Sequence, residues 1–267
     1  MAVNKYLPFI AFLFHAILQG QSFTRNDTVF NQIGPRGMKQ GYWEKTYPDG
    51  TVEYRGYFVD NQPVGEFIRY HENGHVKARM YFTGKNGVSY ARLYYGDGTL
   101  AGEGKYTGTR KDSTWKYYSY YGGHLSYMEN YLNGKKEGIS LKYYPDGSVG
   151  EKLEWKNAQR HGVWQQYYID GTPLLRSTYV NDKLNGPYTI WHENGVKAIS
   201  GNYRMDVREG NWKYYDEEGN LKVTITYRDG VPLNQDQLLK QELEFLNRLE
   251  QNKGKFTEPE LEDLIRK

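Results

Sequence analysis

Residues 71–75 read His-Glu-Asn-Gly-His, which is the spacing of the zinc-peptidase string HExxH. In such an enzyme the two histidines share one face of a helix and bind Zn²⁺, while the glutamate acts as general base. Here Asn73-Gly74 is a pair typical of tight turns, and a turn does not align the two rings. The related segment that begins at His192 has Val196 in place of the second histidine. We therefore interpret residues 71–75 as a turn and expect no metal site there.

The other reactive residue types form no recognisable catalytic pattern. Residues 102–108 contain three glycines, but they have one residue too many for a dinucleotide-binding fingerprint and precede no helical sequence. His124 and His161 lie at loop positions without a partner pattern. The chain has 0 Cys, which excludes a thiol nucleophile and a cysteine-ligated zinc site. We expect no catalytic, metal-binding or cofactor-binding residue, and thus no enzyme.

One aromatic column remains as a candidate binding surface. Its members each lie four residues before a glycine that recurs along the chain. They are Tyr70, Tyr94, Tyr143, Tyr167, Trp191 and Tyr215. Such a ladder can stack sugar rings or receive the apolar surface of a partner. It can also stabilise a sheet by cross-strand packing, and both interpretations stay open.

These residues belong to a repeat whose turn glycines stand at positions 50, 74, 98, 123, 147, 171, 195 and 219. The intervals are 24 residues, with one of 25. Eight positions after each glycine lies an aromatic residue. This column holds Phe58, Phe82, Tyr106, Tyr131, Trp155, Tyr179, Tyr203 and Tyr227. A fixed period of this length is the signature of a repeat architecture, which we place at residues 41–230.

Each unit has the composition of a β-hairpin, because runs rich in Tyr, Trp, Val and Thr flank an Asp-Gly or Asn-Gly pair. Two-residue turns with positive φ at both central positions are expected there, which would pair Trp43 with Gly56 and Tyr47 with Val52. One sheet face then carries an aromatic core and the other is mainly polar. We predict an all-β repeat protein, an elongated antiparallel ribbon of about eight hairpins that are stable only collectively.

The units resemble the MORN repeat. Residues 54–60 followed by Gly65 resemble its Tyr-x-Gly-x-aromatic-x-Asp/Asn pattern, and residues 162–171 and 210–219 resemble the bacterial variant of the repeat. The Gly-x-aromatic core recurs in residues 103–106 and 200–203. The resemblance implies binding or scaffolding and supplies no catalytic residues. Bacterial members of the variant family are often labelled antitoxin-like (YwqK-like).

The N-terminal residues 1–22 have the pattern of a signal peptide. Lys5 is their only charge, residues 6–18 are nearly all apolar, and Gly20-Gln21-Ser22 resembles a cleavage site. About 13 apolar residues are too few for a membrane-spanning helix, which needs about 20. We expect export to the periplasm, cell envelope or extracellular space, with residues 23–40 as a linker or N-terminal cap.

The C-terminal residues 235–267 have a helical pattern. Leu238, Leu239, Leu243, Leu246 and Leu249 occur at helical spacing, and residues 257–260 fit a capping box that opens a second short helix. An open ribbon must hide its terminal edge, so we expect this tail to be an end cap, with partner binding as the alternative.

The charge balance of the chain limits the classes of partner that it can be expected to bind. Lys+Arg number 35 and Asp+Glu 32, a formal net charge of +3, which does not favour nucleic-acid binding. No basic stripe supports binding to a membrane. We expect a non-catalytic exported protein that acts as a protein-interaction scaffold or binding module. The alternatives are a cell-wall or carbohydrate-binding module that uses the aromatic ladder, and an antitoxin-like component.

Overall fold

The structure is a computed structural model that describes residues 22–26 and 28–233. The regular elements of these residues are all strands. The chain divides into two units, residues 1–115 and 116–267, and the division falls inside β10 (Arg110–Tyr118). The predicted signal peptide, except Ser22, and the predicted C-terminal helices lie outside the described residues, so they stay predictions.

The first unit is built from antiparallel hairpins. Its strands are β1 (Phe23–Arg25), β2 (Thr28–Phe30), β3 (Gln32–Ile33), β4 (Lys39–Thr46), β5 (Val52–Val59), β6 (Gln62–Tyr70), β7 (Val76–Phe82), β8 (Val88–Tyr94), β9 (Leu100–Thr107) and the start of β10. The repeats supply the hairpins β4–β5, β6–β7 and β8–β9, and each pairs with the next. One pairing is parallel, between Phe30 on β2 and Tyr42 on β4.

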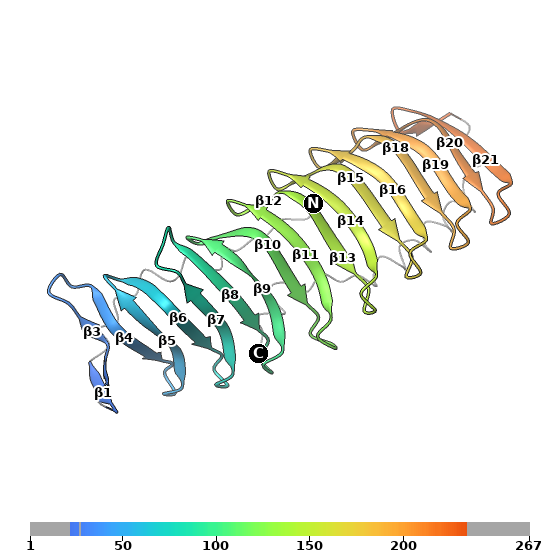
Figure 1. The fold of residues 1–267 in the computed structure, drawn as a ribbon. Coiled ribbons are helices and arrows are strands. Elements are labelled where there is room, and N and C mark those ends of the chain that lie inside the picture. The colour runs from blue at the N-terminus through green and yellow to red at the C-terminus, as the bar shows by residue number, and fades with distance from the viewer. Residues whose placement is uncertain (1–21, 27, 234–267) are drawn as a thin grey trace. The chain divides into compact units, whose positions relative to one another are not determined.

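The second unit continues the same pattern. Its strands are β11 (Leu125–Leu132), β12 (Lys135–Lys136), β13 (Gly138–Tyr143), β14 (Val149–Lys156), β15 (Gln159–Tyr167), β16 (Pro173–Val180), β17 (Lys183–Leu184), β18 (Gly186–Trp191), β19 (Lys197–Arg204), β20 (Val207–Tyr215), β21 (Leu221–Arg228) and β22 (Val231–Pro232). Within each unit the hairpins lie side by side, with the repeated turns along one edge and the connections between repeats along the other (Figure 1). The predicted all-β repeat of antiparallel hairpins is confirmed.

The turns that contain the repeated glycines differ from the prediction. The amide of Tyr47 donates to Thr51 O at 2.7 Å and the amide of Gly50 donates to Tyr47 O at 3.0 Å. Only the glycine has positive φ, at 87° for Gly50, so the loop has three residues and ends in a left-handed glycine. We call this the turn edge of the sheet.

The strand register is partly as predicted. Trp43 pairs with Gly56, as expected, but Val52 pairs with Thr46 and not with Tyr47. The reason is a β-bulge between Lys45 and Thr46, which absorbs the extra loop residue and restores the expected register further along the hairpin. A bulge stands at the same place in the hairpins β6–β7, β8–β9, β13–β14, β15–β16, β18–β19 and β20–β21.

The two-residue turns with two positive φ values lie at the opposite edge, where one repeat connects to the next. Asn181 and Asp182 have φ of 51° and 68°, and Val180 pairs with Lys183 around them. We call this the loop edge. Tight turns of this type match the right-handed twist of the flanking strands.

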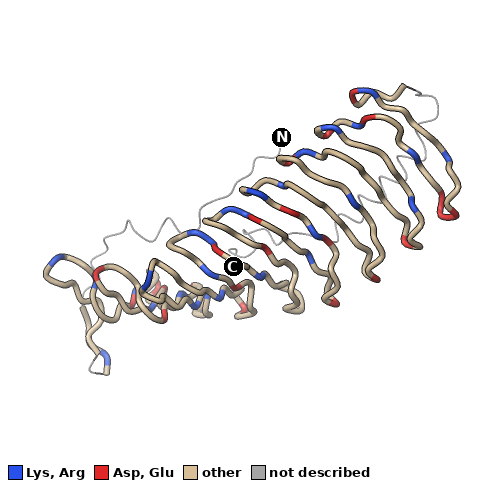
Figure 2. The backbone as a smooth tube through the Cα atoms, turned by 45° about the horizontal axis from the view of Figure 1, so that its top comes forward, with Lys and Arg blue, Asp and Glu red and all other residues tan. Residues whose placement is uncertain are grey.

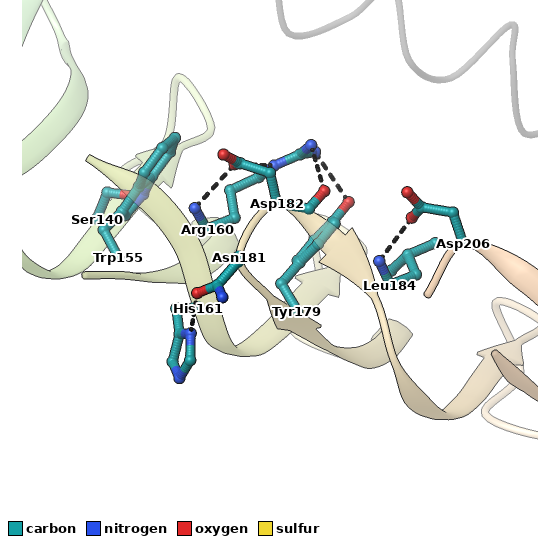
Figure 3. Close-up of polar contacts among 9 residues, drawn as sticks. All are labelled: Ser140, Trp155, Arg160, His161, Tyr179, Asn181, Asp182, Leu184 and Asp206. Carbon is teal, nitrogen blue, oxygen red and sulfur yellow. Dashed lines mark hydrogen bonds and ion pairs between the residues drawn. The ribbon is translucent and has the colours of Figure 1, made fainter. Parts of the chain in front are cut away.

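The loop edge also joins successive repeats (Figure 3). Asp182 Oδ1 accepts the amide hydrogen of Arg160 at 2.9 Å, and the Asp182 amide donates to Arg160 O at 2.9 Å. The same reciprocal pair links Asp206 to Leu184 one repeat later. Asn61 and Lys39 form it in the first unit. Each of these reciprocal pairs, which we call loop clasps, spans 22 residues of the chain.

The aromatic core lies on the face that bears Trp43, which we call the core face. In the first unit Trp43, Tyr54, Phe58 and Phe67 form one buried cluster. In the second unit Trp212 is 1% exposed within a cluster of eight buried residues. Glycines opposite the large rings make room for them. A Cβ built on Gly56, Gly104 or Gly201 would overlap the ring of Phe67, Trp115 or Trp212, respectively.

A column of cations, which the repeat pattern did not predict, covers the rings at the loop edge. The members stand eleven residues before the turn glycine, or twelve in the longer repeat. They are Lys39, Lys111, Lys136, Arg160 and Arg208. Lys39 Nζ, for example, lies 4.3 Å from the ring centre of Trp43 and donates to Tyr54 Oη at 3.0 Å. These cations are part of the structure that holds the rings.

Candidate functional site

The HExxH-like segment is a turn, as predicted. His71 Nε2 lies 3.0 Å from Tyr94 O, and His75 Nδ1 lies 2.7 Å from Gly96 O in the next repeat. Both rings therefore bond to backbone carbonyls and fasten one turn to its neighbour. Among residues 22–26 and 28–233, no group of three or more metal-ligating side chains converges.

Tyrosine hydroxyls perform the same task along the turn edge. The hydroxyl of Tyr47 donates to Tyr70 O at 2.8 Å. In the second unit Tyr144 donates to Tyr167 O and Tyr168 donates to Trp191 O, both at 2.8 Å. These donors stand three residues before the turn glycine, directly after the column that we proposed as a binding surface.

The structure places that proposed column at the β-bulges. Every member is the last residue of its strand and is half-buried. Tyr70 ends β6, Tyr94 ends β8, Tyr143 ends β13, Tyr167 ends β15, Trp191 ends β18 and Tyr215 ends β20. Burial raises the pKa of Tyr143. Members of neighbouring repeats are separated by an intervening strand, which puts Val76 beside Tyr70 and Pro173 beside Tyr167. Within the described chain no ring of the column contacts another.

A second set of tyrosines is more exposed. On the face opposite the core, which we call the outer face, Tyr42 is 53%, Tyr57 40%, Tyr81 58% and Tyr90 56% exposed. Tyr42 pairs across the strands with Tyr57, and Tyr81 with Tyr90. The four residues, which we call the outer tyrosine row, run across β4, β5, β7 and β8. In the first unit the solvent-exposed outer face thus carries four large aromatic side chains among its charged residues.

The hydroxyls of the outer tyrosine row are available for hydrogen bonds with a ligand. In the part of the chain that the structure describes, none of the four forms a hydrogen bond, in contrast to Tyr47, which donates to Tyr70 O. Tyr42 and Tyr57 do contact each other, with ring centres 5.0 Å apart in an edge-on arrangement. Tyr42 also lies 6.1 Å from the ring centre of Phe30, and each of the four side chains is 40–58% exposed.

The second unit shows that the repeat does not require tyrosine at these positions. Seven residues after the turn glycine, where the first unit has Tyr57 and Tyr81, the second has polar residues. They are Asn130, Glu154, Thr178, Asn202 and Thr226. Eight residues before the glycine, where the first unit has Tyr42 and Tyr90, it has Ile139, Val163, Pro187 and Asn211. The tyrosines are thus a property of the first unit and not of the fold.

Ion pairs flank the outer tyrosine row. Glu44 accepts from Arg55 at 2.6 Å and from Arg25 at 3.0 Å. Burial alone would raise the pKa of Glu44, but its hydrogen bonds with Arg25 and Arg55 outweigh this effect and lower the pKa. Three further pairs lie along the row. They are Arg79–Glu66 at 3.0 Å, Arg92–Glu103 at 3.3 Å and Lys105–Asp112 at 2.8 Å.

The two edges of the second unit differ in charge (Figure 2). The turns carry acidic residues, among them Asp146, Asp170 and Glu193, whereas the loop edge carries lysines and arginines together with acidic residues such as Asp182. Many of the basic residues at the loop edge are paired, such as Arg160 with Asp182 at 3.2 Å and Arg204 with Asp229 at 2.6 Å. Much of the positive charge at the loop edge is therefore neutralised by ion pairs.

Comparison with known families identifies the repeat. The pattern of the MORN repeat variant matches residues 63–83, 136–157 and 208–229. Each match covers a hairpin region in the period described above. The chain is a MORN-repeat protein. MORN repeats are in general protein- or membrane-interaction modules, and their family is non-enzymatic.

Other comparisons add little to this assignment. No curated protein has a significantly similar sequence. Among solved structures, the chain is similar to a part of the GtfA/B complex, with 16% identity over 34% of this chain and 18% of that one, at a TM-score of 0.25. It is also similar to a part of the Photorhabdus luminescens Tc holotoxin pore, with 11% identity over 74% of this chain and 13% of that one, at a TM-score of 0.21. The MORN-repeat chain thus spans less than a fifth of either. Its described residues include no helix long and apolar enough to cross a membrane.

Proposed function

We propose that this MORN-repeat protein is a non-catalytic, exported binding module and scaffold. The outer tyrosine row is the observation that carries the proposal. Large exposed aromatic side chains are enriched at recognition surfaces, because they bury much area and retain a polar group. The clasped repeats supply a rigid support, since side chains at both edges bond to the next repeat.

The core face is less suited to this role. Its rings are buried against one another, and the cation column covers them at the loop edge. The half-buried column of Tyr70 and its counterparts is not a continuous surface. The outer tyrosine row is therefore the surface through which we expect a partner to be bound.

A variant that replaces only the row tests this function. Tyr42→Val, Tyr57→Thr, Tyr81→Thr and Tyr90→Val introduce residues that the second unit uses at the same register. The full chain, immobilised, is incubated with a cell-envelope extract and with purified candidate partners found in it. We expect binding to be lost in the quadruple variant and kept in Tyr121→Thr, which removes a tyrosine that is 83% exposed in a turn. Equal binding by the wild type, the quadruple variant and Tyr121→Thr would refute a binding role for the outer tyrosine row.

A further inference from the structure

We infer that the ligand of the outer tyrosine row is a neutral polysaccharide chain. This inference rests on the proposed function and names the chemical class of the partner. The ring of a tyrosine offers a flat apolar face to the C–H groups of a sugar, and its hydroxyl is a donor and acceptor for sugar hydroxyls. The row presents both, since its four hydroxyls have no hydrogen bond among the described residues and its side chains are 40–58% exposed.

The charges beside the row favour an uncharged ligand. Its flanks contain Arg55, Arg79, Arg92 and Lys105, and each cation has a carboxylate partner at 2.6–3.3 Å. Because Arg25 shares Glu44 with Arg55, these five cations and four carboxylates leave a net charge of +1. A single excess charge gives only weak attraction to an acidic polymer such as a nucleic acid. Ion pairs still have lone pairs and N–H groups that can bond to sugar hydroxyls. A highly charged protein surface would find no large complementary charge beside the outer tyrosine row.

The arrangement of the row favours a chain over a single sugar. Tyr42 and Tyr57 lie on the adjacent strands β4 and β5, and Tyr81 and Tyr90 lie on β7 and β8. Strand β6 separates the two pairs. Because neighbouring strands lie about 4.8 Å apart, the two pairs are about 14 Å apart, a span that several linked sugars can cover. The two pairs together would bind one extended chain, and a monosaccharide would reach only one of them.

The test uses the full chain and defined oligosaccharides. Binding is measured by calorimetry with the neutral oligomers cellohexaose and chitohexaose, with glucose and N-acetylglucosamine as monomers, and with heparin as an acidic polymer. We expect the hexamers to bind, the monomers to bind at least about tenfold more weakly, and heparin not to bind through the row. The quadruple Val/Thr variant should lose the hexamer affinity by at least about tenfold.

A matched variant separates ring stacking from loss of structure. Tyr42→Phe, Tyr57→Phe, Tyr81→Phe and Tyr90→Phe keep the rings and remove only the hydroxyls, so this protein should keep most of the affinity. Circular dichroism and the midpoint of thermal unfolding confirm that both variants fold. If neither hexamer binds, or if the Val/Thr variant binds as well as the wild type, the glycan inference is wrong. The proposed binding function would still hold after that result if the Val/Thr variant fails to capture a protein that the wild type captures. It would be wrong if both capture that protein equally.

Discussion

The indole Nε1 of Trp164 donates a hydrogen bond to Glu151 Oε2 at 3.1 Å, inside the aromatic core of the second unit. Trp212 occupies the same place two repeats later, but there Ile199 stands where Glu151 would be, and the Trp212 indole nitrogen has no partner among the described residues. The repeat therefore accepts either a carboxylate or an aliphatic side chain beside this ring. Glu151 is 8% exposed and also bonds to Gln166 and Lys142.

We predict that Glu151→Ala lowers the free energy of unfolding by about 2–3 kcal/mol, because it leaves three donors without an acceptor and opens a cavity. Glu151→Leu leaves the same three donors without an acceptor but fills the cavity, as Leu175 does at the equivalent position of the next repeat, so it should cost about 1 kcal/mol less than Glu151→Ala. Urea unfolding of both variants measures this. A larger loss for leucine than for alanine would contradict the argument.

Gly201 lies against the ring of Trp212, and a Cβ there would overlap it. We predict that Gly201→Ala lowers the free energy of unfolding by about 3 kcal/mol, because the buried indole cannot move away. Combination with Trp212→Leu should remove most of this extra cost. A double-mutant cycle gives the coupling energy, and additive losses would show that the ring is not the obstacle.

Asp182 combines a left-handed backbone with two hydrogen bonds of the loop clasp to Arg160. We predict that Asp182→Ala costs about 2 kcal/mol, from the lost acceptor and the strain of alanine at φ 68°. Asp182→Asn should cost less than about 0.5 kcal/mol, because Asn61 forms the equivalent clasp in the first unit. Equal losses in the two variants would be inconsistent with the clasp.

Tyr168 links two repeats through its hydroxyl, and burial together with nearby acidic groups raises its pKa to about 12. A raised pKa favours the neutral form in the folded protein. Its contribution to stability is therefore complete below pH 10, the ordinary value, and is lost as the pH rises toward about 12. Tyr168→Phe should be about 1 kcal/mol less stable than the wild type at pH 7, and the difference should shrink between pH 10 and 12. Unfolding curves at pH 7, 10 and 11.5 measure this, and a difference that is constant with pH would disprove it.

Trp164 packs against the buried cluster of the second unit. We predict that Trp164→Ala lowers hydrogen-exchange protection in the repeats on both sides as well as in its own, because stacked repeats stabilise one another. Tyr121→Thr, at a solvent-exposed turn position, is the control. Unchanged protection in both neighbouring repeats would show that the repeats are independent.

Much of the fold could be predicted because the same weak indications of turns and strands recur in every repeat. One Asp-Gly pair indicates a turn, and eight turn glycines at a fixed interval indicate an array of hairpins. The pairing of Trp43 with Gly56 followed from the same spacing. The turn type did not, because a two-residue loop and a three-residue loop followed by a bulge give the same register at Trp43. They differ in the φ of the residue before the glycine and in the pairing next to the turn, where Val52 pairs with Thr46 and not with Tyr47.

The proposed binding surface was harder to predict, because the sequence does not show whether the hydroxyl of a tyrosine on a sheet forms a hydrogen bond. The column of Tyr70 and its counterparts was proposed because it recurs regularly, but residues that the fold requires also recur in every repeat. Tyr42, Tyr57, Tyr81 and Tyr90 occur only in the first unit, and that departure from the repeat is the signal that could have revealed them. In a repeat protein, positions where one unit deviates from the others are better candidates for function than positions that all units share.

The loop clasps have a consequence for how such a chain can change in length. In the three clasps described above, donor and acceptor are 22 residues apart, so a duplicated segment of 24 residues that holds such a clasp brings both of its halves and meets its neighbours in the correct register. Duplication or deletion of a whole unit therefore creates no unmatched edge within the array. The number of repeats can change during evolution without loss of fold, and a binding surface confined to a few units can be kept while the rest of the array grows or shrinks.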